Sequence, residues 1–190
     1  MTVETLEMEL KKQILQPIYV LYGEETFLLE NCVNKIKKIF GNKIDGINYI
    51  MLDETSANNI ISEMDTPAFG FEKKLIIIKK PELLKRGSKL KNLQEKLNQY
   101  IEQNIEHIKQ NILLVFIEEK IDKLKITSTF EKYGAVCNFE KLKPTEIVKR
   151  LKVICIQYGV EVNEKDLSYL IDIAGTSMTN LINEIRKLIE

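Results

Sequence analysis

The positions of apolar residues divide this chain into short continuous runs and longer segments with helical spacing. The continuous runs are rich in Ile, Leu, Val and aromatic residues and predict strands at residues 18–22, 47–52, 74–78, 112–117 and 135–139. Between them, apolar residues that recur every three or four positions predict helices at residues 4–15, 25–40, 57–64, 89–108 and 124–133. Continuous apolar runs are typical of strands buried on both faces, so the alternation predicts an α/β fold with a mostly parallel sheet flanked by helices.

The strand pattern then stops, and three helical segments close the chain at residues 145–158, 163–174 and 177–189. Glycines and small polar residues stand at the expected helix caps, namely Gly159, Gly175, Asn163 and Ser177 or Thr176. We therefore predict two domains, an α/β domain at residues 1–142 and a small three-helix lid domain at residues 143–190. The last helix keeps its apolar period up to the terminus, which predicts that the chain is part of a longer one.

The composition fits a folded protein without a membrane span. The 190 residues include 44% hydrophobic positions, too many for a disordered chain, and the 28 basic and 28 acidic residues cancel. No apolar run approaches the ~20 residues of a transmembrane helix, and the amino terminus lacks the pattern of a signal peptide. The three cysteines form no CxxC pair, so neither a disulfide framework nor a zinc knuckle is expected. These features favour a soluble protein of the reducing cytoplasm.

A sheet followed by a small helical bundle is the layout of AAA+ ATPases, which bind ATP through a phosphate loop. That loop needs the pattern GxxxxGK[ST], yet the first strand is followed by Gly23-Glu24-Glu25, and no glycine in the chain precedes a lysine. The third strand ends in Lys79-Lys80, where carboxylates would hold magnesium. The fourth strand ends in Glu118-Glu119, and without a phosphate loop we expect both glutamates to be surface charges. The sequence therefore predicts no nucleotide, metal or other cofactor.

Other catalytic patterns are equally weak. The single histidine, His107, lies in a polar helix beside Glu106 and Lys109, where a solvated role is expected. The patterns GxSxG, HExxH and GxGxxG do not occur, and one histidine argues against His-based triads and metal clusters. We therefore expect a protein that is not an enzyme by itself.

One turn carries apolar residues where polar ones are usual. Pro67 and Gly70 mark a turn just before the third strand, and Phe69 and Phe71 lie at its apex. An aromatic residue that fills a pocket on a partner concentrates binding free energy in a small contact. We predict that Phe69 is exposed and acts as such an anchor, whereas Phe71 fits either the surface or the core.

Positive charge is concentrated between residues 73 and 96. This stretch contains nine basic residues and two glutamates, which gives a local charge of +7. The pattern is compatible with a solvated surface, with nearby DNA or with a partner surface, and the abundance of lysine throughout the chain favours the first. No aromatic residues alternate with these charges to support base stacking. A DNA or partner contact would use Lys79, Lys80, Lys85, Arg86, Lys89 and Lys91.

Several segments, taken in order, carry a resemblance to a known family. They are residues 19–25 (YVLYGEE), 66–78 (TPAFGFEKKLIII), 114–123 (LVFIEEKIDK), 135–140 (AVCNFE) and 175–188. Their order and spacing across the whole chain resemble the delta subunit of the bacterial DNA polymerase III clamp loader. The resemblance implies an AAA+-like (RecA-type) module that binds the β sliding clamp and favours its opening during DNA replication, while related subunits hydrolyse ATP.

The resemblance also implies a site and partners. The clamp-binding element of the family corresponds here to Thr66, Pro67, Ala68, Phe69 and Phe71. A bulky apolar residue is usual where Ala68 stands, so weaker clamp binding is expected. Related subunits carry an arginine finger where this chain has Thr127-Ser128-Thr129, which favours delta over delta-prime or the motor subunit. The implied partners are the β clamp, primed DNA at the replication fork, and the gamma/tau and delta-prime subunits, joined mainly through a C-terminal collar domain.

Two other functions stay open at this point. A stand-alone DNA-binding module would bind DNA without a clamp, with an affinity that falls steeply as salt rises. A degenerate nucleotide-binding AAA+ protein would gain thermal stability in millimolar ATP. The absence of a phosphate loop in the sequence makes the nucleotide-binding function the harder one to sustain.

Overall fold

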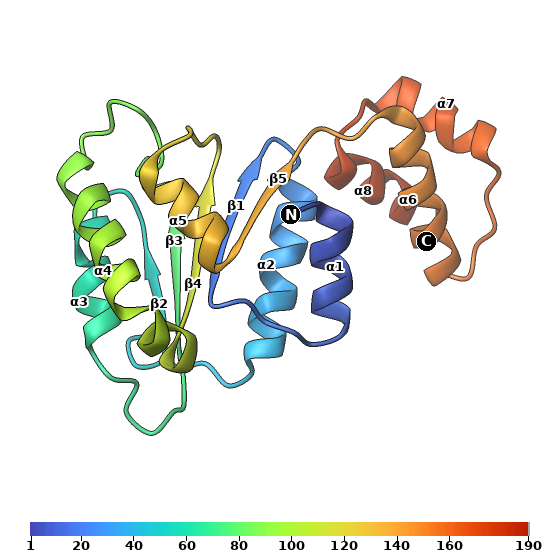
Figure 1. The fold of residues 1–190 in the computed structure, drawn as a ribbon. Coiled ribbons are helices and arrows are strands. Elements are labelled where there is room, and N and C mark those ends of the chain that lie inside the picture. Colours follow the sequence, from blue (N-terminus) through green and yellow to red (C-terminus); the bar gives the residue numbers. More distant parts are fainter. Residues whose placement is uncertain (190) are drawn as a thin grey trace. The chain divides into compact units, whose positions relative to one another are not determined.

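The computed structural model describes residues 1–189 and forms two compact units, an α/β unit of residues 1–139 and a helical unit from residue 140 onward (Figure 1). The domain boundary expected at Leu142 falls in the segment between the last strand and the next helix. Glu190, the last residue of the expected helical domain, lies outside the described residues.

The α/β unit is built on a five-stranded sheet in the order β2-β3-β4-β1-β5. All neighbouring strands are parallel, and Tyr19 in β1, for example, lies between Val115 in β4 and Ala135 in β5. The strands are β1 (Ile18–Gly23), β2 (Tyr49–Leu52), β3 (Lys74–Lys79), β4 (Ile112–Glu118) and β5 (Ala135–Phe139). The five predicted strands are therefore confirmed. Because they all run in one direction, their starts share one side of the sheet, here called the amino edge, and their ends share the opposite carboxyl edge.

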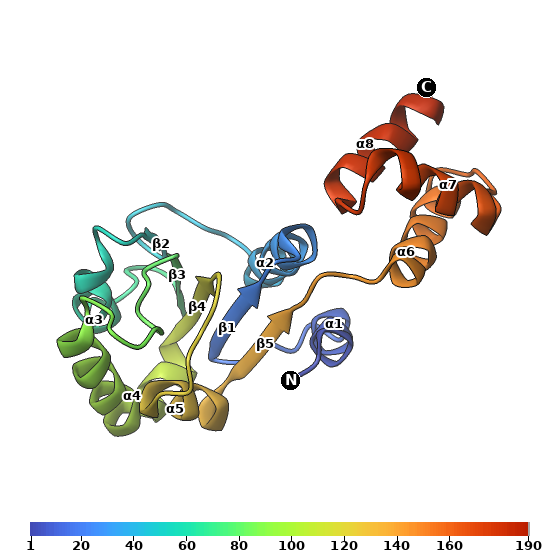
Figure 2. The same cartoon turned by 90° about the horizontal axis from the view of Figure 1, so that it is seen from above.

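Helices cover both faces of this sheet, as Figure 2 shows. One face is covered by α1 (Val3–Lys11) and α2 (Thr26–Phe40), and the other by α3 (Ile60–Asp65), α4 (Lys91–Asn111) and α5 (Lys125–Tyr133). Side chains of a strand alternate between the faces, so Ile18 and Val20 join the core under α4 and α5, whereas the equally buried Tyr19 and Leu21 point to the opposite face. The predicted architecture of a parallel sheet flanked by helices is confirmed.

Local backbone conformation and hydrogen bonds explain two differences between the observed and the predicted bounds. The first helix stops at Lys11 instead of residue 15, because Gln13 adopts a φ of 59° and turns the chain towards β1. The second strand begins at Tyr49, two residues later than expected, because the Asn48 side chain closes a turn. Its Oδ1 accepts from the Ile44 N–H at 2.7 Å, and its Nδ2 donates to the Asn42 carbonyl at 2.9 Å.

The helical unit contains α6 (Pro144–Gln157), α7 (Glu164–Ala174) and α8 (Met178–Ile189). Two of the predicted caps are confirmed: the Asp166 N–H donates to Asn163 Oδ1 at 2.8 Å, and Gly175 follows α7 with a φ of 81°. The three helices bury one shared apolar core, with Leu151, Ile171 and Leu181 among its members. No helix within residues 1–189 has the length and apolar content that crossing a bilayer requires.

Candidate functional site

The segment of residues 66–73, here called the tip loop, connects α3 to β3 at the amino edge of the sheet (Figure 1, the loop at the bottom of the view). The Phe71 N–H donates to the Ala68 carbonyl at 2.9 Å and closes a four-residue turn. Gly70, the third residue of this turn, has a φ of 81°, the left-handed conformation that a type II turn requires there. Phe69 is the second residue, and 77% of it is exposed. The predicted exposure of Phe69 is confirmed.

The other predicted residues of the tip loop surround this apex. Thr66 and Pro67 are exposed, and Ala68 and Phe71 are half-buried. Ala68 and Phe71 line a small hollow of about 160 Å³ between the tip loop and the end of α4, where His107 and Asn111 form the far wall. Phe71 therefore lies at the boundary between surface and core. The sequence had allowed either an exposed or a core position, and the structure shows an intermediate one.

The chain that enters the tip loop is tied to its surroundings. The Thr66 hydroxyl donates to the Ser62 carbonyl at 2.7 Å, which extends the last turn of α3. One residue earlier, Asp65 Oδ1 accepts from the Tyr100 hydroxyl of α4 at 2.5 Å. Partial burial and this bond to a carboxylate raise the pKa of Tyr100, so the hydroxyl keeps its proton at neutral pH.

The chain that leaves the tip loop is held by two lysines. Lys74 is buried, and its Nζ donates to the Glu63 carbonyl at 2.9 Å and lies 3.6 Å from Glu63 Oε2. Lys73 Nζ donates to the Lys109 carbonyl near the carboxyl end of α4 at 3.1 Å. Both ends of the turn are thus hydrogen-bonded to α3 or α4, and these bonds fix the position of the turn that carries Phe69.

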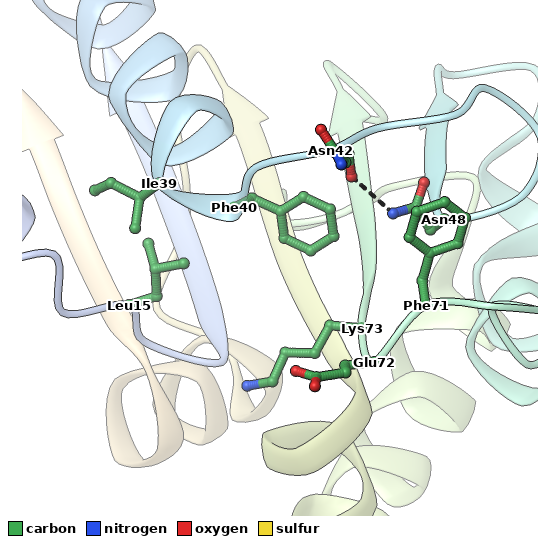
Figure 3. A pocket seen from close by; sticks show the side chains of 8 residues that line it. All are labelled: Leu15, Ile39, Phe40, Asn42, Asn48, Phe71, Glu72 and Lys73. Carbon is green, nitrogen blue, oxygen red and sulfur yellow. Dashed lines mark hydrogen bonds between the residues drawn. The ribbon is translucent and has the colours of Figure 1, made fainter.

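A second hollow, of about 280 Å³, lies on the other side of Phe71 and is here called the amino hollow. Figure 3 shows Phe40 near its centre, with Leu15 and Ile39 on one side and Asn48 and Phe71 on the other. The polar residues of its lining are Asn42, Asn48, Glu72 and Lys73. Sequence reasoning missed this hollow, because its walls come from the segments before β1, β2 and β3 and no motif connects them.

At the carboxyl edge, the turn after β1 is closed against β5. Gly23 has a φ of 128°, and a Cβ at this position would lie 2.3 Å from the Phe139 carbonyl oxygen. The Glu25 N–H donates to that same oxygen at 2.9 Å, and the Thr26 N–H donates to the Glu24 carbonyl at 3.0 Å. A phosphate loop needs free backbone N–H groups at this place, and here two of them are engaged within the chain.

The end of β4 corrects one prediction. Glu118 is only 2% exposed and is not a surface charge. Its Oε1 accepts from the N–H groups of Leu83 and Leu84, at 3.1 and 3.4 Å, because this apolar pair folds back over the strand end and its amides need an acceptor. Burial raises the pKa of Glu118 to about 7. Its neighbour Glu119 is exposed and pairs with Lys80 at 2.8 Å, as a surface charge should.

The predicted basic residues extend from Lys79, the last residue of β3, to Lys91, the first residue of α4. The loop of residues 80–90, here called the basic loop, is fixed by Asp122, whose Oδ2 accepts from the Arg86 N–H at 2.6 Å, and by Gln94, whose Nε2 donates to the Lys85 carbonyl at 3.1 Å. Lys80 and Lys85 are paired with Glu119 and Glu82. The candidates that pair with no acidic side chain among residues 1–189 are Lys79, Arg86, Lys89 and Lys91.

The structure also splits the basic stretch seen in the sequence. Lys73, in the tip loop, and Lys74, at the start of β3, form hydrogen bonds that hold the tip loop, whereas Lys79 and the basic loop lie at the opposite edge. The run of positive charge is therefore not one surface. His107 is exposed on α4, and residues 1–189 hold no group of His, Cys, Asp and Glu suited to a metal ion.

A comparison with known protein families identifies the family of this chain. Residues 19–140, most of the α/β unit, match the family described as DNA polymerase III, delta subunit. The chain belongs to this delta subunit family. The matched range includes the tip loop, the closed turn after β1 and the basic loop.

Two curated relatives of the delta family extend the match to nearly the whole chain. The DNA polymerase III subunit delta of Bacillus subtilis (strain 168) is 24% identical over 185 residues, 94% of this chain and 53% of the relative. A probable DNA polymerase III subunit delta of Aquifex aeolicus (strain VF5) is 25% identical over 182 residues, 91% of this chain and 49% of the relative. The chain thus spans about half the length of the curated delta subunits it matches.

Solved structures support the fold of this delta family member. The Bacillus subtilis DNA clamp loader delta protein superimposes with a TM-score of 0.74 at 23% identity, over 98% of this chain and 57% of that one. A RuvB variant from Thermotoga maritima superimposes with a TM-score of 0.52 at 12% identity, over 95% of this chain and 57% of that one. At these identities the likeness shows the architecture alone.

Proposed function

We propose that this chain is a non-catalytic clamp-loader subunit that binds the β sliding clamp through the tip loop and favours opening of the ring, so that the clamp can be loaded on primed DNA at the replication fork in the cytoplasm. The observation that carries the proposal is an exposed aromatic residue, Phe69, on an anchored turn at the amino edge of a delta-family chain. Its partners in the assembly are the gamma/tau and delta-prime subunits.

The geometry of the tip loop suits a binding anchor. Truncation to alanine of an aromatic hot-spot residue that fills a partner's pocket costs ~2 kcal/mol or more of binding free energy. The turn holds Phe69 out of the protein, and the bonds to Ser62, Glu63 and Lys109 fix its base, so little conformational freedom is lost on binding. Ring opening then follows if the tip fits the open clamp better than the closed one, because a ligand shifts an equilibrium only by its difference in affinity.

The carboxyl edge supports a subunit that hydrolyses no ATP itself. The turn after β1 packs on Phe139, and Lys79 at the end of β3, followed by Lys80, stands where a magnesium site needs carboxylates. In the proposed assembly the motor subunits supply hydrolysis, and this chain supplies a contact with the clamp.

The test of the proposal is binding to the sliding clamp of the same organism, measured by surface plasmon resonance. We expect the native chain to bind and Phe69→Ala to bind at least tenfold more weakly, a loss of ~1.4 kcal/mol. Tyr169→Ala is the matched control, because Tyr169 is an aromatic residue with 68% exposure on α7 of the helical unit. Native binding without loss in Phe69→Ala would move the anchor elsewhere, and no binding to a competent clamp would contradict the proposal.

The basic loop favours a second, accompanying role. We propose that Lys79, Arg86, Lys89 and Lys91 contact the DNA backbone, since these four cations have no acidic partner among the described residues while their neighbours Lys80 and Lys85 do. Fluorescence anisotropy with primed DNA across a salt series tests this. The double variant Arg86→Glu and Lys89→Glu should lower the affinity and flatten the slope of log affinity against log salt by about 2. An unchanged slope would leave these side chains as solvated surface.

A further inference from the structure

Phe69 alone is too small to form the interface that the proposed function needs. A buried aromatic side chain contributes ~150–250 Å² of surface. A specific, stable protein interface buries ~800 Å² on each partner. Even a fully inserted Phe69 therefore supplies less than a third of the required area, and the contact must continue over the surface around the tip loop.

The amino hollow is the apolar surface that continues from the tip loop. Phe71 and Glu72 line both this hollow and the smaller one on the other side of the tip loop, so the two concave surfaces meet at the turn that carries Phe69. Leu15, Ile39 and Phe40 form its apolar wall (Figure 3). The adjoining segments add exposed apolar residues, Ile14 and Ile44, with 47% and 48% exposure. Gathered apolar exposure of this kind marks protein contacts.

The size and charge of the amino hollow narrow the kind of occupant. Its volume of about 280 Å³ is below the ~300–1,000 Å³ of pockets for small molecules, and it suits one large side chain. The charged residues of its lining, Glu72 and Lys73, have opposite signs, which favours neither an acidic nor a basic ligand. The occupant that fits best is therefore a neutral apolar side chain.

The amino hollow is also preformed. Asn48 bonds to both Ile44 and Asn42 and so fixes the turn that forms one wall. Lys73, on the opposite rim, is tied to the Lys109 carbonyl. A cavity held open by such bonds costs little ordering when it is filled.

We infer that the amino hollow is a second receptor for the sliding clamp, and that it takes one apolar side chain which the clamp presents beside the pocket that holds Phe69. This inference rests on the proposed function, because it assigns the same partner. It makes the contact reciprocal: this chain inserts Phe69 into the clamp, and the clamp inserts a side chain into this chain. The two insertions together fix the angle between the proteins, which a single anchor would leave free to rotate.

The experiment fills the amino hollow and measures clamp binding by surface plasmon resonance. In Asn42→Trp the new ring occupies the hollow, while the bond from Asn48 survives because it uses the backbone carbonyl. We expect binding at least fivefold weaker, mainly through faster dissociation. Asn92→Trp is the matched control, since Asn92 is likewise an exposed asparagine but lies at the start of α4, next to the basic loop, and it should bind like the native chain.

A second variant keeps the test decisive if Asn42→Trp folds poorly. Phe40→Leu removes part of the wall with little change in helix propensity, and it should weaken clamp binding two- to threefold with an unchanged thermal melt. Loss of binding in Phe69→Ala together with native-like binding in both hollow variants would overturn the inference and leave the proposed function standing. Failure of the native chain to bind a competent clamp would overturn both. A native dimer that Asn42→Trp dissociates would identify the occupant as a second copy of this chain and also overturn the inference.

Discussion

The loops at the two edges of the same parallel sheet differ: those at the carboxyl edge pack inward, and the one that carries Phe69 at the amino edge is exposed. At the carboxyl edge the side chains and amides turn inward: Glu118 is buried beneath the basic loop, and the turn after β1 packs against β5. At the amino edge the chain turns outward, with Phe69 exposed on the tip loop and hollows on both sides of Phe71. Open α/β sheets usually bind their ligands at the carboxyl edge. Here the features that suit binding an apolar partner lie at the other one.

The difference shows how one scaffold can support two kinds of function. Parallel sheets keep their core when their loops change, since the core depends on the strands and helices and not on either edge. Closing the carboxyl edge engages the amides that a phosphate would need, whereas the turn before β3 exposes an aromatic side chain at the amino edge.

The buried glutamate at the carboxyl edge should make the stability of the native protein depend on pH. Folding raises the pKa of Glu118 from an ordinary 4.5 to about 7, so between these values the folded state binds more protons than the unfolded state. This contribution to stability is complete below pH 4.5 and is lost as the pH rises to about 7, a change of up to about 3 kcal/mol. Glu118→Gln keeps an acceptor for Leu83 and Leu84 and should lack this decline.

Urea unfolding of the native chain and Glu118→Gln from pH 4.5 to pH 8 measures the effect. The control is Glu119→Gln, because Glu119 is exposed and its pKa is lowered by Lys80, in the direction opposite to Glu118. Parallel pH profiles for the native chain and Glu118→Gln would contradict the assignment of Glu118 as a buried acid. Clamp affinity per folded molecule should not change in either variant, since neither residue lies at the amino edge.

Loosening the base of the tip loop should weaken clamp binding without unfolding the sheet. Tyr100→Phe removes the hydrogen bond to Asp65, a loss of ~1 kcal/mol. Because the turn that carries Phe69 then starts from a less fixed residue, we expect clamp binding about threefold weaker by surface plasmon resonance. Tyr133→Phe, at a half-buried tyrosine of α5, serves as the control. Native affinity in Tyr100→Phe would show that the tip loop does not depend on the bond from Tyr100, and would leave the Lys73 bond to α4 as its support.

Enlarging a small residue of the tip loop should strengthen clamp binding. Ala68 is half-buried beside Phe69, and Ala68→Leu adds apolar surface to the contact, which we expect to tighten binding about threefold, or ~0.7 kcal/mol. The same change in the Phe69→Ala background should give little gain, since the anchor is then missing. A tightening of equal size in both backgrounds would argue against a single contact that includes both residues.

Nucleotide should have no effect on the carboxyl edge. With millimolar ATP and magnesium the melting temperature should stay within the error of a thermal-shift measurement, because the amides after β1 are engaged with Phe139 and Glu24. A reproducible increase in melting temperature would mean that the closed turn opens to bind phosphate. It would then favour the degenerate nucleotide-binding function.

Much of this fold could be predicted from the sequence, and the reason is physical. The five buried strands are continuous apolar runs, and Pro67 with Gly70 marked the turn that exposes Phe69. The burial of Glu118 could not be predicted, because it depends on where Leu83 and Leu84 fold, and a glutamate at a strand end has the same local pattern whether it is buried or exposed.

Contacts between segments that are far apart in the sequence could not be predicted either. The amino hollow combines three connections that are separate in the sequence, and the bond from Tyr100 to Asp65 joins residues on different helices. The basic stretch shows the opposite error, since Lys74 and Lys79 are close in the chain but stand at the two ends of β3, on opposite edges of the sheet. Neighbourhood in sequence is a poor guide where a strand separates the residues.

Hydrogen–deuterium exchange with and without the sliding clamp examines both edges of the sheet in one experiment. We expect the clamp to slow exchange in peptides that cover residues 66–73 and to leave exchange at residues 80–91 unchanged. Slowed exchange at residues 80–91 with no change at residues 66–73 would place the clamp on the carboxyl edge and contradict binding through the tip loop.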